Sequence, residues 1–181
     1  MRKEIYIIIQ LLVPRIFISI YYFLKYKTKV SLKAEVDFTP QITFGKNCVV
    51  SSFTKIKGRN GRVSLGDNSG FATGCFISAG KRGIQIGKNV FFGPNVSVTS
   101  SNYVFHKLHA NVHTSRGIKI GNNILIGANC SILDGAELSD NTIVNANTVI
   151  NRKFKPNVVV SGNPAEVVYE MKENNLVRKE K

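Results

Sequence analysis

The feature that most constrains this chain is an aliphatic or aromatic residue at every sixth position. Two stretches show the period clearly, IGKNVFFGPNVSV at residues 86–98 and IGNNILIGANCSILDGAELSDNTIVNANTVI at residues 120–150. The lead positions of these six-residue repeats are Ile86, Phe92, Val98, Ile120, Ile126, Ile132, Leu138, Val144 and Ile150. A helical period of 3.6 residues cannot explain a strict spacing of six, and neither can the two-residue alternation of a strand.

A short strand followed by a two-residue corner does explain this spacing. Glycine often follows the lead residue and asparagine comes two positions later, as at Gly127 and Asn129. Both residue types accept, at low cost, the left-handed backbone conformations that tight corners require. Three such sides close a triangular coil, and stacked coils pair as parallel strands about 4.8 Å apart. The sequence therefore predicts an all-β fold, a parallel β-helix of hexapeptide repeats with the lead residues inside.

The same period assigns positions to the three cysteines of the chain. Cys48, Cys75 and Cys130 each come four residues after a lead position, where a small side chain points into the coil. They are too few and too scattered for a disulfide framework, and they lack the spacing of zinc ligands. We therefore predict three buried structural thiols, a reducing cytoplasmic environment and no bound metal.

The N-terminal segment, residues 1–33, differs in kind from the repeats. It carries seven basic residues and one acidic residue, and its mostly apolar stretch 5–24 is interrupted by Pro14 and Arg15. We expect an amphipathic helix lying in the plane of a membrane, with lysine and arginine reaching the headgroups. A helix that covers the main domain and a helix that spans the bilayer are the alternatives. The predicted localisation is cytoplasmic, peripheral at the inner membrane surface.

The repeats at 120–150, followed by VVVSGNPAEVV at 158–168, resemble the hexapeptide-repeat acyltransferases. Within that family the chain is most similar to the maltose, nodulation and capsule polysaccharide O-acetyltransferases. The resemblance implies a left-handed β-helix, a homotrimer with active sites between neighbouring subunits, acetyl-CoA as co-substrate and a histidine as general base. It divides the chain into the segment 1–33, an acyltransferase domain at 34–165 and a short C-terminal helix or tail at 166–181.

The period is interrupted between Val98 and Ile118, and we place a loop at residues 99–117. A packed coil has no room for a catalytic side chain, whereas a loop can present one. Imidazole, with a pKa of about 6.5, suits proton transfer near neutral pH. Tyr103 stands where relatives carry the histidine, so a part for Tyr103 in the chemistry stays open. We expect His106 to be the general base; the loop also holds the two alternatives, His109 and His113.

The resemblance places acetyl-CoA along the coils that follow this loop. We expect Arg152 and Lys153 to donate charge-assisted hydrogen bonds to the CoA phosphates. The full set of matching cofactor positions is Gly127, Ala128, Ala146, Asn151, Arg152 and Lys153.

The net charge of +14, from 25 basic and 11 acidic residues, favours anionic partners. The aromatic and basic residues do not form a nucleic-acid-binding pattern, so we expect no nucleic-acid partner. The expected function is transfer of acetyl from acetyl-CoA to a hydroxyl of a cell-surface saccharide, or of its lipid-linked or nucleotide-linked precursor. N-acetylation of an amino sugar is one alternative, and a non-catalytic β-helix scaffold subunit is another.

Overall fold

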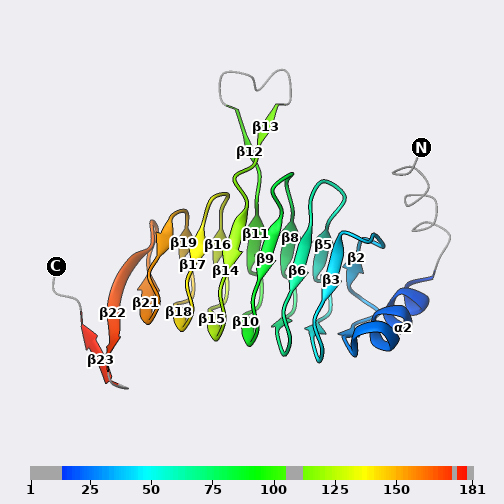
Figure 1. Ribbon diagram of the computed structural model, residues 1–181, viewed down its shortest axis with the longest axis horizontal. Coiled ribbons are helices and arrows are strands. Elements are labelled where there is room, and N and C mark those ends of the chain that lie inside the picture. The colour runs from blue at the N-terminus through cyan, green and yellow to red at the C-terminus, as the bar shows by residue number, and fades with distance from the viewer. Residues whose placement is uncertain (1–13, 105–111, 173–174, 179–181) are drawn as a thin grey trace.

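The computed structural model describes residues 14–104, 112–172 and 175–178 of the chain. These residues form one elongated parallel β-helix, with a helix at its N-terminal end and a hairpin that projects from its side (Figure 1). The predicted all-β fold of stacked hexapeptide coils is confirmed.

Three sheets form the three sides of the β-helix, and we number them sheet 1 to sheet 3. Sheet 1 runs in the order β1 (Lys29–Val30), β4 (Val49–Val50), β7 (Gly70–Phe71), β10 (Val90–Phe92), β15 (Ile124–Ile126), β18 (Thr142–Val144), β21 (Val158–Ser161), β22 (Glu166–Lys172), β23 (Asn175–Arg178). Sheet 2 runs in the order β19 (Val149–Ile150), β16 (Ser131–Ile132), β11 (Ser97–Thr99), β8 (Phe76–Ser78), β5 (Lys55–Lys57), β2 (Glu35–Val36). Sheet 3 runs in the order β20 (Lys153–Phe154), β17 (Glu137–Leu138), β14 (Ile118–Ile120), β9 (Ile84–Ile86), β6 (Val63–Leu65), β3 (Ile42–Phe44).

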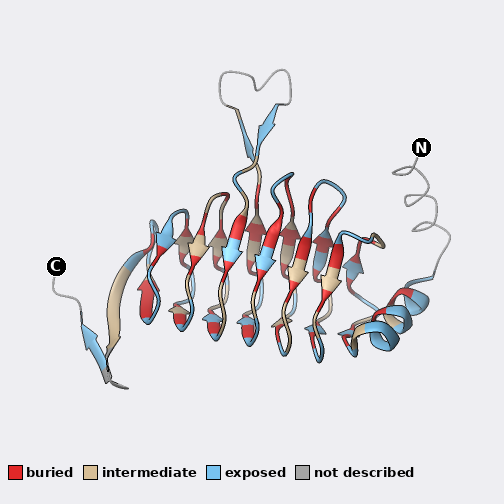
Figure 2. Cartoon of the chain, viewed as in Figure 1, coloured by how far each residue is buried: buried red, intermediate tan, exposed pale blue. Residues whose placement is uncertain are grey.

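The core fills the inside of the triangular coils (Figure 2). Every lead position named above is buried, and so is the residue four positions later in each repeat, except after Val98, where Asn102 begins the exposed hairpin stem. The strands pair in parallel with the equivalent strands of the next coil; in sheet 1, for example, Phe92 pairs with Ile126 and Ile126 pairs with Val144. Cys48, Cys75 and Cys130 are free and buried, as predicted, and burial raises the pKa of all three thiols.

Asparagine and glycine contribute to the corners in different ways. Asn123 and Asn129 adopt left-handed φ angles of 56° and 58°, as the sequence predicted. The glycines that follow the lead residues are needed for another reason, which is the close approach of one coil to the next. A Cβ atom on Gly127 would lie 2.4 Å from the backbone nitrogen of Ala146. Along one corner the asparagine side chains also form a ladder, in which Asn89 donates to Asn123 at 2.9 Å and Asn123 donates to Asn141 at 3.2 Å.

The helix α2 (Arg15–Tyr26) covers the N-terminal end of the β-helix, beside its first coils (Figure 1). Ile18 and Tyr22 are buried there, and the ring of Tyr22 packs edge-on against Phe44 at 4.9 Å. The first strand of the β-helix is β1, so the coils begin slightly before the predicted boundary at residue 34. Within the described ranges, no helix combines the length and the apolar character needed to cross a bilayer.

The short C-terminal helix predicted at 166–181 is wrong for the described residues. They form two strands instead: β22 pairs antiparallel with β21, and β23 pairs antiparallel with β22. The last coil leaves one edge of sheet 1 unpaired, and an additional strand satisfies its backbone groups. The sequence EVVYEMK supplies Val167, Val168 and Tyr169, which are strong strand formers.

Candidate functional site

The predicted loop contains a hairpin that rises from the corner between sheet 2 and sheet 3 (Figure 1). Its stem consists of β12 (Asn102–Tyr103) and β13 (His113–Thr114), paired antiparallel. The backbone N–H of Val104 donates to the carbonyl of Val112 at 2.9 Å and extends this pairing. His106 and His109 lie at 105–111, outside the described residues.

The stem brings together two of the residues that the sequence singled out. Tyr103 pairs with His113 across the hairpin, and their ring centroids are 4.1 Å apart with the planes inclined at 42°. Both side chains are exposed. Tyr103, for which the sequence analysis left a part in the chemistry open, therefore lies directly beside an imidazole.

The base of the hairpin is fixed by Asp134, a residue that sequence reasoning missed. Its carboxylate is buried and accepts the backbone N–H of Arg116 at 2.8 and 2.9 Å and that of Gly117 at 2.9 Å. On the other side of the stem, the hydroxyl of Ser115 donates to the carbonyl of Ser100 at 2.6 Å. These bonds tie the hairpin to the coils on both sides. The available signal was an acidic residue in ILDGAE, at a corner where other repeats carry glycine and asparagine.

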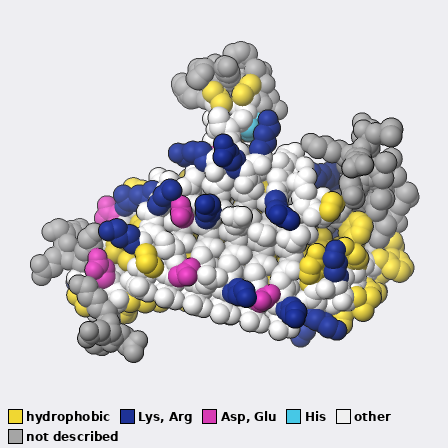
Figure 3. All heavy atoms as spheres, viewed as in Figure 1, with side chains coloured by type: hydrophobic (Ala, Val, Ile, Leu, Met, Phe, Trp, Pro, Cys, Tyr) yellow, Lys and Arg dark blue, Asp and Glu magenta, His cyan; other side chains and the backbone are white. Residues whose placement is uncertain are grey.

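Basic side chains gather around the hairpin base (Figure 3). The backbone N–H of Arg82 donates to the hydroxyl of Ser115 at 3.1 Å, and the guanidinium of Arg116 donates to the carbonyl of Asp134 at 2.9 Å. The side chains of Arg82 and Arg116 both remain exposed, beside Lys81. Such a group of cations can meet phosphate groups through charge-assisted hydrogen bonds.

The six predicted cofactor residues do not converge on one pocket. Those on the corner between sheet 1 and sheet 2 are Gly127, Ala128 and Ala146. Those on or just past the opposite corner, between sheet 2 and sheet 3, are Asn151, Arg152 and Lys153. The two groups border the same side of the β-helix. Between them sheet 2 presents short side chains in one register, in which Ser97 pairs with Ser131 and Ser131 pairs with Val149.

The two predicted phosphate ligands already have partners within the chain. The guanidinium of Arg152 donates to the carbonyl of Ala165 at 2.5 Å and lies 5.4 Å from the ring centroid of Phe154. The ammonium of Lys153 lies 2.9 Å from the carboxylate of Glu137 and holds the pKa of that carboxyl below its usual range. The side chains of both residues are exposed, but a phosphate at this corner would compete with these existing contacts.

A hollow of about 590 Å³ lies on sheet 3, which contains the strand that follows the hairpin. Its lining includes Gln85, Lys119, Glu137 and Asp140, so donors and acceptors of both charges face it. Such a lining suits the hydroxyl groups of a sugar better than an apolar ligand. In the part of the chain that the structure describes, no three histidine, cysteine or acidic side chains are grouped so that they could hold a metal ion.

The sequence and the fold of this chain were compared with those of known proteins. Residues 117–152 match the sequence family described as "Hexapeptide repeat of succinyl-transferase". A comparison with curated proteins finds no match.

Three solved structures illustrate the similarity of the fold. A variant of AntD, an N-acyltransferase from Bacillus cereus solved with dTDP-4-amino-4,6-dideoxyglucose and coenzyme A, is 16% identical with a TM-score of 0.73, covering 84% of this chain and 88% of that one. A maltose O-acetyltransferase from Clostridium difficile 630 is 24% identical with a TM-score of 0.62, covering 81% and 67%. PerB from Caulobacter crescentus, solved with CoA and GDP-perosamine, is 19% identical with a TM-score of 0.58, covering 77% and 56%.

The expected resemblance is confirmed at the level of fold. The chain has the left-handed parallel β-helix of the hexapeptide-repeat acyltransferases. Its hand is opposite to the right-handed rule for parallel crossovers, so the six-residue spacing alone did not determine it.

Proposed function

We propose, from the fold that this chain shares with acyltransferases, that it transfers an acetyl group from acetyl-CoA to a hydroxyl of a saccharide. The acceptor is a cell-surface saccharide or its lipid-linked or nucleotide-linked precursor. The observation that carries the proposal is the hairpin at 102–114, which interrupts the coils, holds every histidine of the chain and rises from a group of exposed cations.

In the proposed reaction His106 accepts the proton of the acceptor hydroxyl while the hydroxyl oxygen attacks the thioester carbonyl. The carbon–oxygen bond forms, and the negative charge on the tetrahedral intermediate is stabilised by backbone N–H groups that border the site. The carbon–sulfur bond then breaks, and the proton held by the imidazole passes to the leaving CoA sulfur. All atoms and charges balance within the hydroxyl, the thioester and one imidazole.

Acetyl-CoA is proposed to lie along the face of sheet 2 that the two predicted corners border. The short side chains of Ser97 and Ser131 leave room for an extended ligand, and the coils bring small residues to the surface at Ala128 and Ala146. The crystallised AntD and PerB proteins contain coenzyme A, which supports a CoA-type donor for this fold. Of the two arginines at the hairpin base, Arg82 is the better placed partner for phosphate, because the guanidinium of Arg116 already donates to the carbonyl of Asp134 at 2.9 Å.

N-acylation of an amino sugar is the second candidate, and one observation favours it. The AntD structure, an N-acyltransferase solved with an amino-sugar nucleotide, has a TM-score of 0.73, whereas the maltose O-acetyltransferase has 0.62. The same base and donor groove serve both reactions, because an amine and a hydroxyl each lose one proton on acylation.

We expect the purified full-length chain to release free CoA thiol from acetyl-CoA only when a suitable acceptor is present. Parallel assays with neutral sugars, nucleotide sugars and amino-sugar nucleotides identify the acceptor class. Mild alkali removes an acetyl ester and leaves an amide intact, so mass spectrometry before and after alkali distinguishes O-acetylation from N-acetylation. Absence of thiol release together with absence of acetyl-CoA binding by calorimetry would favour the scaffold alternative.

A homotrimer forms part of the proposal, because the family's sites lie between subunits. Sheet 1 offers an apolar surface for it. Outward-facing residues of successive strands pair in one register, and Phe91 and Leu125 are both more than half exposed. The whole ladder runs through Val49, Gly70, Phe91, Leu125 and Ile143. A continuous apolar strip of this kind is typical of a surface that a partner covers.

We expect light scattering of the full chain to give three times the monomer mass at micromolar concentration. The double variant Phe91→Lys and Leu125→Lys should dissociate, because burying unpaired ammonium groups costs several kcal/mol each. Leu176→Lys, an exposed leucine on β23, is the matched control and should remain a trimer. A monomeric wild-type chain would contradict both the assembly and the sites between subunits.

A further inference from the structure

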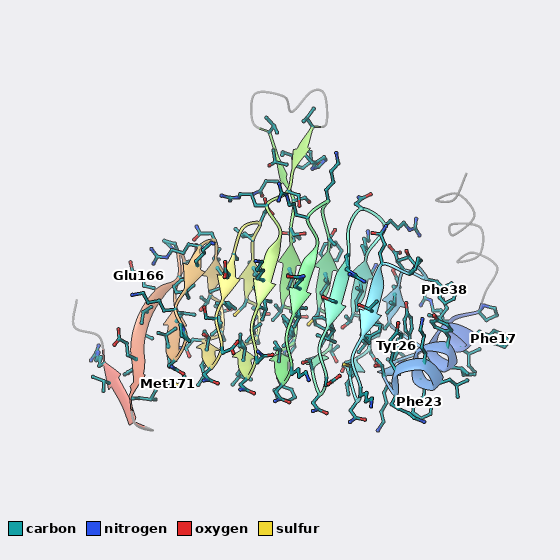
Figure 4. All side chains as sticks on the ribbon, viewed as in Figure 1. Phe17, Phe23, Tyr26, Phe38, Glu166 and Met171 are labelled. Carbon is teal, nitrogen blue, oxygen red and sulfur yellow. The ribbon has the colours of Figure 1, made fainter. Side chains whose placement is uncertain are left out.

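The helix α2 turns a second apolar face away from the β-helix. We call it the outer α2 face, and it consists of Ile16, Phe17, Ile20, Phe23 and Leu24, which follow the i, i+3, i+4, i+7 spacing of one helix side. Phe17 is 60% exposed and Leu24 is 70% exposed. Figure 4 shows Phe17 and Phe23 on the side of α2 that points away from the coils, and Figure 3 shows apolar side chains gathered at this end of the molecule.

The opposite face of α2 packs on the β-helix, so the outer α2 face points away from the protein's own core. Ile18 and Tyr22 are buried against the first coils, and the hydroxyl of Ser19 donates to the carbonyl of Val30 at 2.7 Å. These contacts fix the rotation of the helix about its axis. The cover-helix alternative from the sequence therefore accounts for one face of α2 and leaves the other without a covering partner within the described residues.

Positive charge predominates in and beside α2, where Arg15 is paired with Glu35 at 3.5 Å. Residues 14–33 contain five basic residues and no acidic residue, namely Arg15, Lys25, Lys27, Lys29 and Lys33. The ammonium of Lys27 lies 5.7 Å from the ring centroid of Phe23, and that of Lys25 donates to the hydroxyl of Tyr21 at 2.8 Å. Apolar and aromatic rings bordered by long cationic side chains form the arrangement that places rings among acyl chains and charges among headgroups.

We propose that the outer α2 face docks on the surface of an anionic lipid bilayer, with α2 lying in the plane of the interface. The 12 residues of α2 span about 18 Å, whereas the hydrocarbon core is about 30 Å thick. Its exposed apolar residues also lie on one side, as insertion parallel to the surface requires. The coils between α2 and the hairpin would then hold the hairpin site at a distance from the membrane surface (Figure 1).

The charge around the outer α2 face favours a lipid surface over the two other possible occupants, a second copy of the chain and residues 1–13. A second copy of the chain docked through the same face would bring two groups of five cations together, and Glu35, which pairs with Arg15 at 3.5 Å in each copy, would offset only one of the five. Residues 1–13 folded back on the face would add Arg2 and Lys3 to the same cations, offset only by Glu4. Anionic headgroups supply the missing opposite charge, and acyl chains supply the apolar cover.

Flotation of the full-length chain with vesicles tests the proposal. The vesicles are phosphatidylcholine alone or phosphatidylcholine with about one third phosphatidylglycerol, and we expect binding to the anionic vesicles to be at least about tenfold tighter. The double variant Phe17→Ser and Leu24→Ser should weaken that binding by about tenfold or more. The matched control, Leu176→Ser and Val177→Ser, makes a comparable change at the far end of the molecule and should change binding less than about twofold.

A second pair of variants tests the charge. Lys25→Gln with Lys27→Gln should weaken binding to the anionic vesicles, whereas Lys88→Gln with Lys155→Gln, two exposed lysines on the β-helix, should not. Circular dichroism and thermal unfolding confirm that each variant is folded.

The proposal is overturned if Phe17→Ser with Leu24→Ser binds as the wild type does while deletion of residues 1–13 abolishes binding. It is equally overturned if that variant loses self-association rather than lipid binding. Acyl transfer to soluble acceptors is measured separately, so failure here leaves the proposed function untouched.

Discussion

Replacing His106 by alanine is expected to lower turnover by about 10²–10⁴-fold, the usual contribution of a positioned general base. His106 lies in the segment that joins the two strands of the hairpin stem. The β-helix should remain folded in this variant, because the hairpin projects from the coils and its base is held by Asp134 rather than by a histidine. Binding of acetyl-CoA should also be retained, because the proposed donor groove lies on sheet 2. Steady-state kinetics and calorimetry measure the two effects separately.

The other residues of the hairpin serve as controls for His106. His109→Ala and His113→Ala should lose much less activity. Tyr103→Phe removes the phenolic hydroxyl and keeps the ring that packs against His113 at 4.1 Å, so it reports on chemistry rather than on the stem. If His106→Ala keeps near-normal turnover with the true acceptor while Tyr103→Phe loses it, the base assignment is wrong and the tyrosine takes part in the reaction.

The pH profile gives an independent test of the same assignment. A protonated imidazole cannot accept a proton, so kcat/KM of the wild-type chain should fall as pH decreases through the pKa of the catalytic histidine. The residual activity of His106→Ala should lack this acidic limb. Retention of the limb in the variant would assign it to another group.

Much of the fold could be predicted because each hexapeptide repeats the same physical choice. A buried lead residue such as Ile126 and a small buried residue such as Cys130 recur at fixed offsets, and Asn129 supplies the left-handed corner between them. These are local preferences, and many stacked copies reinforce one another. The strands at the C-terminus lie beyond the repeat. The sequence EVVYEMK does not show that β21 has a free edge with which these residues can pair.

The candidate site could be predicted only in outline, because it depends on contacts between distant coils. The interruption and its histidines were visible in the sequence, and so was the conflict raised by Tyr103. The pairing of Tyr103 with His113 needed the hairpin register, and the role of Asp134 needed the stacking of its corner beneath Arg116. The predicted phosphate ligands Arg152 and Lys153 are engaged within the chain, which no motif could show.

Gly127 was predicted as a cofactor residue, and its substitution is expected to have a large effect for a different reason. A Cβ atom at Gly127 would lie 2.4 Å from the nitrogen and 2.7 Å from the Cα atom of Ala146, and both are backbone atoms of the next coil. Neither can rotate away as a flexible side chain would, so Gly127→Ala must push the two coils apart. We expect the free energy of unfolding to fall by about 1–3 kcal/mol or more, as for other overpacked positions. Denaturant unfolding followed by circular dichroism measures the change.

Gly70→Ala is the matched control, because it makes the same chemical change within β7 of sheet 1, the sheet whose strand β15 ends just before Gly127. There the built Cβ atom has its nearest contact at 3.1 Å, with the carbonyl oxygen of Val49, and its next contact is a side-chain atom at 3.4 Å. The 3.1 Å contact is mildly unfavourable, whereas alanine loses less conformational entropy on folding than glycine does. Because these two effects oppose each other, we expect the free energy of unfolding to change by less than about 1 kcal/mol. Calorimetric titration with CoA then separates the two roles of Gly127. If Gly127→Ala proves as stable as the wild type yet binds CoA at least about tenfold more weakly, the glycine serves the cofactor directly; if stability falls and the residual folded protein binds CoA normally, its role is to let the coils stack.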